Sequence, residues 1–172
     1  ADLRLYGVDG GAVCVDTAPL FERAAATRAS KGFIGKSSMF ILEPFGTFLL
    51  LGEILLRSPL IPTDEKPVAT SSCGSCKRCQ TFCPTGALTM DFTLDARRCL
   101  SYYTIEHRGV IPLPFWPWLK YYVFGCDICQ LACPFNRDAT LAASGTTPWM
   151  PDMIDVVRMT QAQYENYFGG TP

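Results

Sequence analysis

The segment "SSCGSCKRCQTFCPTGAL" at residues 71–88 places four cysteines within eleven positions, and a proline follows the last of them. A shorter version, "FGCDICQLACP", follows at residues 124–134 with three cysteines before a proline. Thiols that recur every third or fourth residue can surround one shared metal centre. This spacing therefore determines how the middle of the chain is expected to fold.

The first segment reads C-x2-C-x2-C-x3-C-P, the run that binds [4Fe–4S] clusters in ferredoxins. Three of its thiolates hold one cluster, and the fourth points toward a second cluster. The second segment lacks one thiol of a full run, and Cys99 lies upstream where it can supply it. The crossed arrangement of two-cluster ferredoxins then predicts one cluster on Cys73, Cys76, Cys79 and Cys133 and a second on Cys83, Cys99, Cys126 and Cys129.

Zinc and disulfides are the alternatives for such a set of thiols. Zinc sites usually combine two C-x2-C pairs across a spacer, so they do not need a run of four cysteines that ends in Cys-Pro. Disulfide frameworks belong to secreted chains, and no basic start followed by an apolar run precedes these cysteines. The ninth cysteine, Cys14, lies far from the others, and we expect a buried free thiol there.

Composition predicts a folded core. Hydrophobic residues make up 48% of the 172 residues, and the formal net charge is −1, which argues against non-specific binding of polyanions by the whole chain. The longest apolar run, "FGTFLLLGEILL" at residues 45–56, is too short to cross a bilayer and contains Glu53. We expect a buried strand or core helix there.

The elements before the cysteines are predicted from their turn and cap residues. Residues 12–15 read as a strand and residues 19–30 as a helix, with Asp16 or Thr17 as its N-cap and Gly32 near its end. The apolar stretch at 32–56 suits buried strands joined by glycine turns.

The rest of the chain divides by composition. Residues 57–70 hold three prolines and read as a linker, 94–109 as a helix, and 110–125 as an aromatic, proline-rich insertion. Residues 151–168 suit one or two short amphipathic helices.

A resemblance covers nearly the whole chain. The segments "VDTAPLFERAAATRASKGFIGKSS", "GTFLLLGEI", "LDARRCLSYYTIEHRG", "FGCDICQLACPFNR" and "YENYFGGTP" resemble, in this order, the epoxyqueuosine reductases. Many proteins share the cysteine run, but the "TIEHRG" and "GCDICQ" stretches are specific to a much smaller group of proteins. The resemblance implies a cytoplasmic enzyme that reduces the epoxide of epoxyqueuosine in tRNA to give queuosine. It also implies two [4Fe–4S] clusters and a cobalamin, with electrons from an external donor passing through the clusters to cobalamin.

The resemblance assigns roles to individual residues. Asp16 stands in the "VD-x-x-P" motif, where the family has its proton donor, although a carboxylate before a helix is often only a cap. Ser101, Asp127 and the backbone of Cys126 should approach the corrin, as should the segment around Phe40. The lone His107 lies in no cobalamin-binding motif, so we expect cobalt without a histidine ligand from the protein. Arg108 is the first choice for a contact with tRNA phosphate.

The expected fold class is α+β. A partial catalytic core like that of reductive dehalogenases spans residues 1–66, a ferredoxin-like module with two [4Fe–4S] clusters spans 67–140, and a short helical tail spans 141–172. We expect the chain to lack the N-terminal part of the catalytic domain, to be inactive alone, to be monomeric, and not to bind a membrane.

Two other functions remain open from the residues. One is a reductive dehalogenase-like enzyme with the same cofactors and a small halogenated substrate. The other is a two-cluster ferredoxin that only carries electrons, although such a carrier has little need for the first 60 residues or so.

Overall fold

The computed structural model describes residues 11–16, 18–29, 32–57, 72–137 and 153–169. It divides into two compact units, Ala1–Ala139 and Thr140–Pro172. The predicted linker at 57–70 lies, after its first residue, outside the described residues. Within the described residues, no helix has the length and apolar character needed to cross a membrane.

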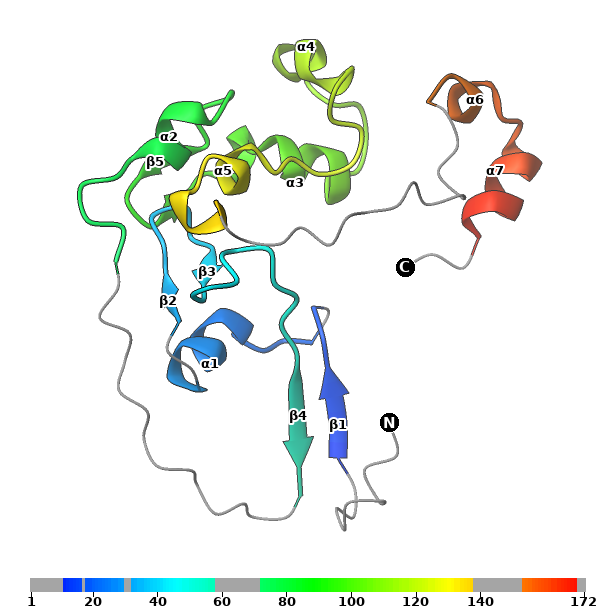
Figure 1. The fold of residues 1–172 in the computed structure, drawn as a ribbon. Helices are drawn as coiled ribbons and strands as arrows, with labels where there is room; N and C mark the ends of the chain where they lie inside the picture. The colour runs from blue at the N-terminus through cyan, green and yellow to red at the C-terminus, as the bar shows by residue number, and fades with distance from the viewer. Residues whose placement is uncertain (1–10, 17, 30–31, 58–71, 138–152, 170–172) are drawn as a thin grey trace. The chain divides into compact units, whose positions relative to one another are not determined.

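A two-stranded antiparallel sheet holds the predicted first strand. Strand β1 (Gly11–Cys14) pairs with β4 (Glu53–Leu56), so that Gly11 lies opposite Leu56 and Cys14 opposite Glu53 (Figure 1). The prediction of a strand at 12–15 is confirmed with a shift of one residue. The apolar run at residues 45–56, for which a strand or a helix was predicted, forms the strand β4 at its end.

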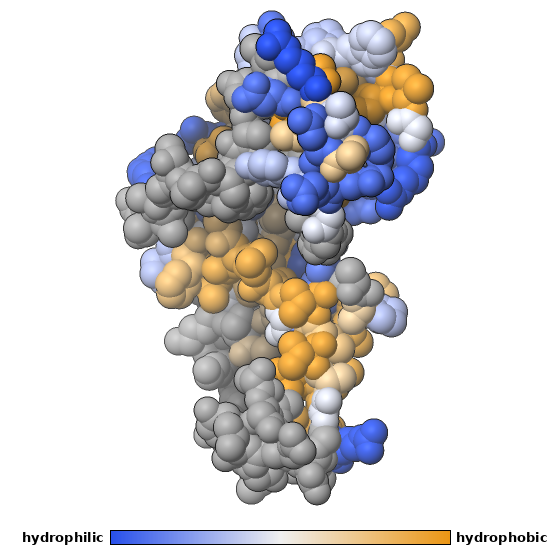
Figure 2. Space-filling view, turned by 90° about the vertical axis from the view of Figure 1, so that its right-hand side faces the viewer, coloured by the Kyte–Doolittle hydropathy of each residue, from blue (hydrophilic) through white to orange (hydrophobic). Residues whose placement is uncertain are grey.

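The prediction that the apolar run forms a buried strand is wrong for β4. Val13 and Ile54 remain more than half exposed, and Leu50 is fully exposed. Figure 2 shows apolar side chains at the surface of the molecule. A two-stranded sheet has two faces and two edges, so it buries little without a third element packed on it. Cys14 is accordingly a free thiol that is half-buried, not buried as expected.

Helix α1 (Glu22–Ala29) lies inside the predicted helix but begins later. Its first helical hydrogen bond joins the Ala25 N–H to the Phe21 carbonyl oxygen, so Asp16 is not its N-cap, and Thr17 lies outside the described residues. Proline disfavours helical backbone in the residue before it, and the chain makes a turn around Pro19 before the helix begins. Glu22, in the first helical turn, accepts a hydrogen bond from the Asp16 N–H at 2.7 Å.

Strands β2 (Phe33–Ile34) and β3 (Phe40–Ile41) form a short hairpin that contributes to the core of the first unit. Ile41 and Phe40 are buried, and the Phe33 ring meets the Phe135 ring edge-on at 5.3 Å between centroids. The hairpin turn occupies residues 35–38, with the Gly35 N–H bonded to the Met39 carbonyl oxygen. This turn, "GKSS", points its central residues toward the cysteines.

The cysteine module is built from short elements with tight turns. Helix α2 packs against α5 and β5, and the β5–β6 hairpin follows it. The elements in chain order are α2 (Arg78–Phe82), β5 (Leu88–Met90), β6 (Thr93–Leu94), η2 (Ala96–Arg98), α3 (Leu100–Ile105), η3 (Leu113–Phe115), α4 (Trp116–Leu119), α5 (Ile128–Leu131) and η4 (Pro134–Asn136).

The helix predicted at 94–109 is divided in two at Cys99. Asp95 accepts a hydrogen bond from the Arg97 N–H and begins the 3-10 turn η2, after which Cys99 is extended with φ −83° and ψ 121°. Helix α3 starts at the next residue. The break places Cys99 in extended backbone between η2 and α3.

The second unit contains α6 (Met153–Arg158) and α7 (Gln161–Phe168). Thr160 and Gln163 form a capping box at the start of α7, which satisfies backbone donors that a helix end otherwise leaves unpaired. The prediction of short helices at 151–168 is confirmed.

Candidate functional site

Four cysteines from two segments line one cavity. The residues around it are Lys36, Ser37, Ile41, Pro134, Phe135 and the thiols of Cys73, Cys76, Cys79 and Cys133. These thiols are the first of the two sets predicted from the sequence. Three come from one loop, and the fourth comes from the second motif, 54 positions after Cys79.

Local backbone geometry places these thiols. The Cys76 N–H bonds to the Cys73 carbonyl oxygen at 3.0 Å, and Gly74 between them has φ +51°, which favours glycine. Cys79 lies in α2. Cys133 precedes η4, where Pro134 takes an early helical position that needs no N–H partner.

The second set of four cysteines lines a larger cavity of about 230 Å³. Cys83 lies just after α2, Cys99 at the break before α3, and Cys126 and Cys129 at the start of the second motif. The Ala87 N–H points at the Cys83 sulfur at 3.2 Å. Backbone N–H groups directed at cysteine sulfur are among the groups that tune iron–sulfur clusters.

The thiols influence one another within these sets. Burial raises the pKa of Cys79, and its neighbours Cys73, Cys133 and Cys76 raise it further. Burial raises the pKa of Cys129 to about 12, with Cys126, Cys83 and Cys99 as the next causes. Thiolates held this closely repel each other, so cationic iron between them relieves an unfavourable arrangement.

Cys83 differs from the other thiols. Burial acts to raise its pKa, but hydrogen bonds from the Ala87 and Thr85 backbone and from the Thr85 hydroxyl outweigh that effect, and its pKa is lowered. A thiol whose anion is stabilised in this way binds metal more readily.

The thiols surround two cavities, with four of them around each. A mononuclear site requires four sulfurs about 2.3 Å from one zinc ion. Four cysteines spread around a cavity are the arrangement expected for a cluster of several irons.

The "GKSS" turn is a part of the site that the sequence reasoning missed. Lys36 and Ser37 are buried, although both are polar, and Ser37 lines both cavities. The signal was available, because a lysine and a serine inside a buried apolar stretch need partners.

The predicted corrin-contact residues lie in different surroundings. Ser101, Cys126 and Asp127 all line the second cavity, together with Met39. Phe40 lies in the core with 5% of its surface exposed, and its ring fills the space beside Gly32. The second cavity therefore combines four thiols with a serine hydroxyl and a carboxylate.

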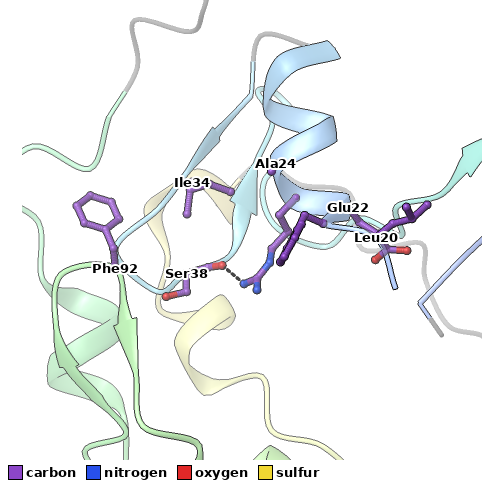
Figure 3. A pocket seen from close by; sticks show the side chains of 8 residues that line it. Leu20, Glu22, Ala24, Ile34, Ser38 and Phe92 are labelled. Carbon is purple, nitrogen blue, oxygen red and sulfur yellow. Dashed lines mark hydrogen bonds between the residues drawn. The ribbon is translucent and has the colours of Figure 1, made fainter. Parts of the chain in front are cut away.

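The predicted proton donor lies next to a separate pocket. Asp16 is exposed and has φ +56°, which a residue with a side chain seldom adopts and which often marks functional sites. Glu22, which holds the Asp16 N–H, lines a pocket of about 470 Å³ together with Phe21, Arg23 and Phe92. Figure 3 shows the arginine of this pocket donating to the Ser38 carbonyl oxygen.

The predicted tRNA contact lies at the surface. Arg108 is exposed between α3 and the aromatic insertion. In that insertion Trp116 and Tyr121 are more than half exposed, although the Trp116 indole N–H donates to the Ile111 carbonyl oxygen. His107 packs its ring against Tyr103 at 5.0 Å between centroids.

A buried polar network joins the second motif to the loop before β4. Thr47 is 2% exposed, its N–H donates to the Asn136 side-chain oxygen, and its hydroxyl donates to Gln130 Oε1 at 2.9 Å. Gln130 in turn donates to Asp127 Oδ1 at 2.6 Å. No local sequence pattern predicts this network, because its members lie up to 89 residues apart.

Comparison with known proteins agrees with this arrangement. Residues 72–136 match the family model described as a 4Fe-4S double cluster binding domain. The chain is 43% identical over 155 residues to an epoxyqueuosine reductase from Salmonella typhimurium, covering 87% of this chain and 40% of that protein. By sequence, the chain is a relative of the epoxyqueuosine reductases. The epoxyqueuosine reductase of Escherichia coli K12 is 47% identical over 127 residues, covering 74% of this chain and 33% of that protein.

Solved structures of epoxyqueuosine reductases share the fold. The enzyme from Streptococcus thermophilus superposes with a TM-score of 0.75 and 35% identity, over 93% of this chain and 42% of that one. An epoxyqueuosine reductase with an epoxyqueuosine-modified tRNA-Tyr stem loop gives a TM-score of 0.73 and 31% identity, over 93% of this chain and 43% of that one. The chain thus spans less than half the length of these relatives.

Proposed function

We propose that this chain is part of an enzyme that reduces epoxyqueuosine in tRNA to queuosine. The similarity to epoxyqueuosine reductases along most of the chain carries the proposal, and the two four-cysteine cavities support it. In this reaction two electrons and two protons convert the epoxide into a carbon–carbon double bond and water. An external donor supplies the electrons.

The two cavities fit a pair of [4Fe–4S] clusters by their donor sets. Cys73, Cys76, Cys79 and Cys133 would bind one cluster, and Cys83, Cys99, Cys126 and Cys129 the other. The clusters supply one-electron transfer when bound. The protein contributes thiolates in fixed positions, amide donors to sulfur, and apolar walls such as Ile41 and Phe135 that limit water.

The second cavity also suits the edge of a cobalamin. Ser101 and Asp127 provide polar groups among apolar side chains such as Met39 and Leu100, which is the usual composition of a cofactor site. We assign Ser101, Asp127 and the Cys126 backbone to corrin contact, while Phe40 supports the site from the core. Cobalamin would supply the reductant for the epoxide, within a catalytic core like that of reductive dehalogenases.

Asp16 is the proposed proton donor to the departing epoxide oxygen. Its N–H donates to Glu22, which supports its unusual backbone conformation, and the residue lies between β1 and α1. A relative from Bacillus subtilis is described with its catalytic aspartate loop swung out of the active site, which supports an aspartate on a loop in this role.

The partner of the enzyme is proposed to be the anticodon stem loop of tRNA. A structurally similar reductase has been solved with an epoxyqueuosine-modified tRNA stem loop. Exposed Arg108 would contact phosphate, and the exposed aromatic insertion offers stacking surfaces for unpaired bases. We also propose that the enzyme is a monomer and is located in the cytoplasm.

Turnover of epoxyqueuosine-containing tRNA by the intact protein tests this function. We expect the Asp16→Asn variant to keep its iron, its cobalamin and its tRNA affinity, and to lose turnover. Full activity of that variant would remove Asp16 from the mechanism. Absence of any turnover by the wild-type protein, loaded with both cofactors, would refute the function itself.

A further inference from the structure

Lys36 is a buried cation at the first cysteine cavity. It occupies the turn between β2 and β3, and only 8% of its surface is exposed. Its N–H points at the Cys73 sulfur at 3.4 Å, and its carbonyl oxygen accepts from the Phe92 N–H at 3.1 Å. Its ammonium group donates to the Gly74 carbonyl oxygen at 2.7 Å. The residue is therefore fixed by the loop that carries the thiols.

The partner of this cation lies on the solvent side. The Lys36 ammonium nitrogen is 3.2 Å from Asp91 Oδ2, and the side-chain exposures are 10% for the lysine and 40% for the aspartate. Gln80 of α2 donates to the other Asp91 oxygen at 3.0 Å. Water screens the more exposed carboxylate more effectively than the buried ammonium group, so Asp91 offsets the Lys36 charge only in part at the cavity.

The second cavity has the opposite charge pattern. Its lining residues include the carboxylate of Asp127 and contain no lysine or arginine. Arg78 acts on Cys133 of the first set, but it is exposed and screened by water. The two sites thus share the same ligand chemistry, but a buried lysine lines only the first. The exposed Arg98, next to Cys99, reaches Gly86 beside the second site, where water screens its charge.

We propose that Lys36 is a positioning residue that raises the reduction potential of the cluster bound by Cys73, Cys76, Cys79 and Cys133 above that of its neighbour. This inference rests on the proposed function, because it requires both clusters. Reduction adds one negative charge to an anionic cluster, and a buried ammonium group stabilises the reduced form more than the oxidised form. The Lys36 side chain also holds the Gly74 turn between two of the thiols.

A redox titration of the intact, cluster-loaded protein, followed by electron paramagnetic resonance, tests this role. In Lys36→Met the N–H to Cys73 is kept and the charge is lost. We expect one of the two reduction steps to move to lower potential, with the reduced-to-oxidised ratio falling about tenfold, or 59 mV for one electron. Lys36→Arg should keep most of the wild-type potential. Asp91→Asn should move the same step to higher potential.

Lys77→Met is the matched control. Lys77 lies next to Cys76 but is exposed, so removing its charge should shift neither step appreciably. Opposite shifts in Lys36→Met and Asp91→Asn cannot come from general loosening of the site. Unchanged potentials in Lys36→Met with full iron and sulfide, or equal shifts of both steps, would overturn the inference.

The iron and sulfide content of the wild-type protein tests the proposed function separately from the role of Lys36. Wild-type protein without iron and sulfide would refute the clusters themselves. If Lys36→Met fails to assemble the first cluster, the Lys36→Gln variant decides, because a lower potential supports the role of Lys36 and an unchanged potential contradicts it.

Discussion

The N–H of Thr47 donates to the side-chain oxygen of Asn136 at 2.7 Å and joins two segments that lie 89 residues apart. The Asn136 amide returns a hydrogen bond to the Thr47 hydroxyl at 2.8 Å and a second to the Gln130 carbonyl oxygen at 2.7 Å. Asn136 ends η4, just after Cys133. The loop before β4 is thereby joined to the motif that supplies Cys133 to the first cavity and Cys126 and Cys129 to the second. We expect the stability of the first unit to depend on this connection.

Replacing Thr47 tests this connection. Thr47→Val keeps the shape of the side chain and removes the hydroxyl, which leaves Gln130 Oε1 and an Asn136 N–H short of a partner in a buried place. We expect a loss of about 1–3 kcal/mol in the free energy of unfolding, measured by chemical denaturation under anaerobic conditions. Thr89→Val at an exposed position of β5 is the control and should change stability little. Equal effects of the two substitutions would contradict a structural role for the network.

Gly46 should tolerate no side chain. Its φ is +74°, and a Cβ atom there would overlap the side-chain oxygen of Asn136. Gly74 also has a positive φ, of +51°, but the space around it is open. We expect Gly74→Ala to cost about 1–3 kcal/mol from backbone strain alone and Gly46→Ala to cost clearly more. Thermal melts of the two variants measure the difference in stability. A larger loss in Gly74→Ala than in Gly46→Ala would show that the Asn136 side chain moves aside at little cost.

Removal of the Arg108 charge should weaken tRNA binding. We expect Arg108→Ala to lower the affinity for an anticodon stem loop and to reduce the slope of log affinity against log salt by about 0.7, the value for one phosphate of a single strand. Arg97→Ala is the control, since the Arg97 side chain is already bound to Asp95 at 3.0 Å. Binding measured by fluorescence anisotropy across salt concentrations checks this. An unchanged slope in Arg108→Ala would exclude the phosphate contact.

The grouping of the thiols was predictable because it follows from local spacing. Three thiols spaced along one short loop face the same cavity. In proteins with two such motifs, the fourth cysteine of each motif binds the cluster of the other motif, which predicts the fourth thiol. The structure brings Cys133 to the first loop and Cys83 to the second motif, as expected. Whether each thiol binds iron remains a prediction.

The contacts that complete the site were not predictable in this way. Lys36 reaches Gly74 across 38 residues, and no local pattern indicates which loop a buried lysine will meet. The expected cap role of Asp16 was wrong because the turn at Pro19 delays the helix. The strand around Ile54 was expected to be buried because it is apolar, but burial depends on a covering element that a hydrophobic pattern does not specify.

The crossed arrangement of ligands can be tested with single substitutions. Cys133→Ala should abolish the cluster shared with Cys73, Cys76 and Cys79 and should therefore lower the iron content by about half. Cys14→Ala should leave the iron content unchanged, because Cys14 lies in β1 outside both cavities. Iron analysis with electron paramagnetic resonance of the remaining cluster distinguishes the two. A loss of iron in Cys14→Ala would place that thiol among the ligands.

Counting iron, acid-labile sulfide and zinc per chain in the anaerobically purified intact protein shows whether the eight thiols bind two [4Fe–4S] clusters. Two [4Fe–4S] clusters require about eight irons and about eight sulfides, with little zinc. Zinc in place of iron, or cysteines joined to each other as disulfides, would contradict the account.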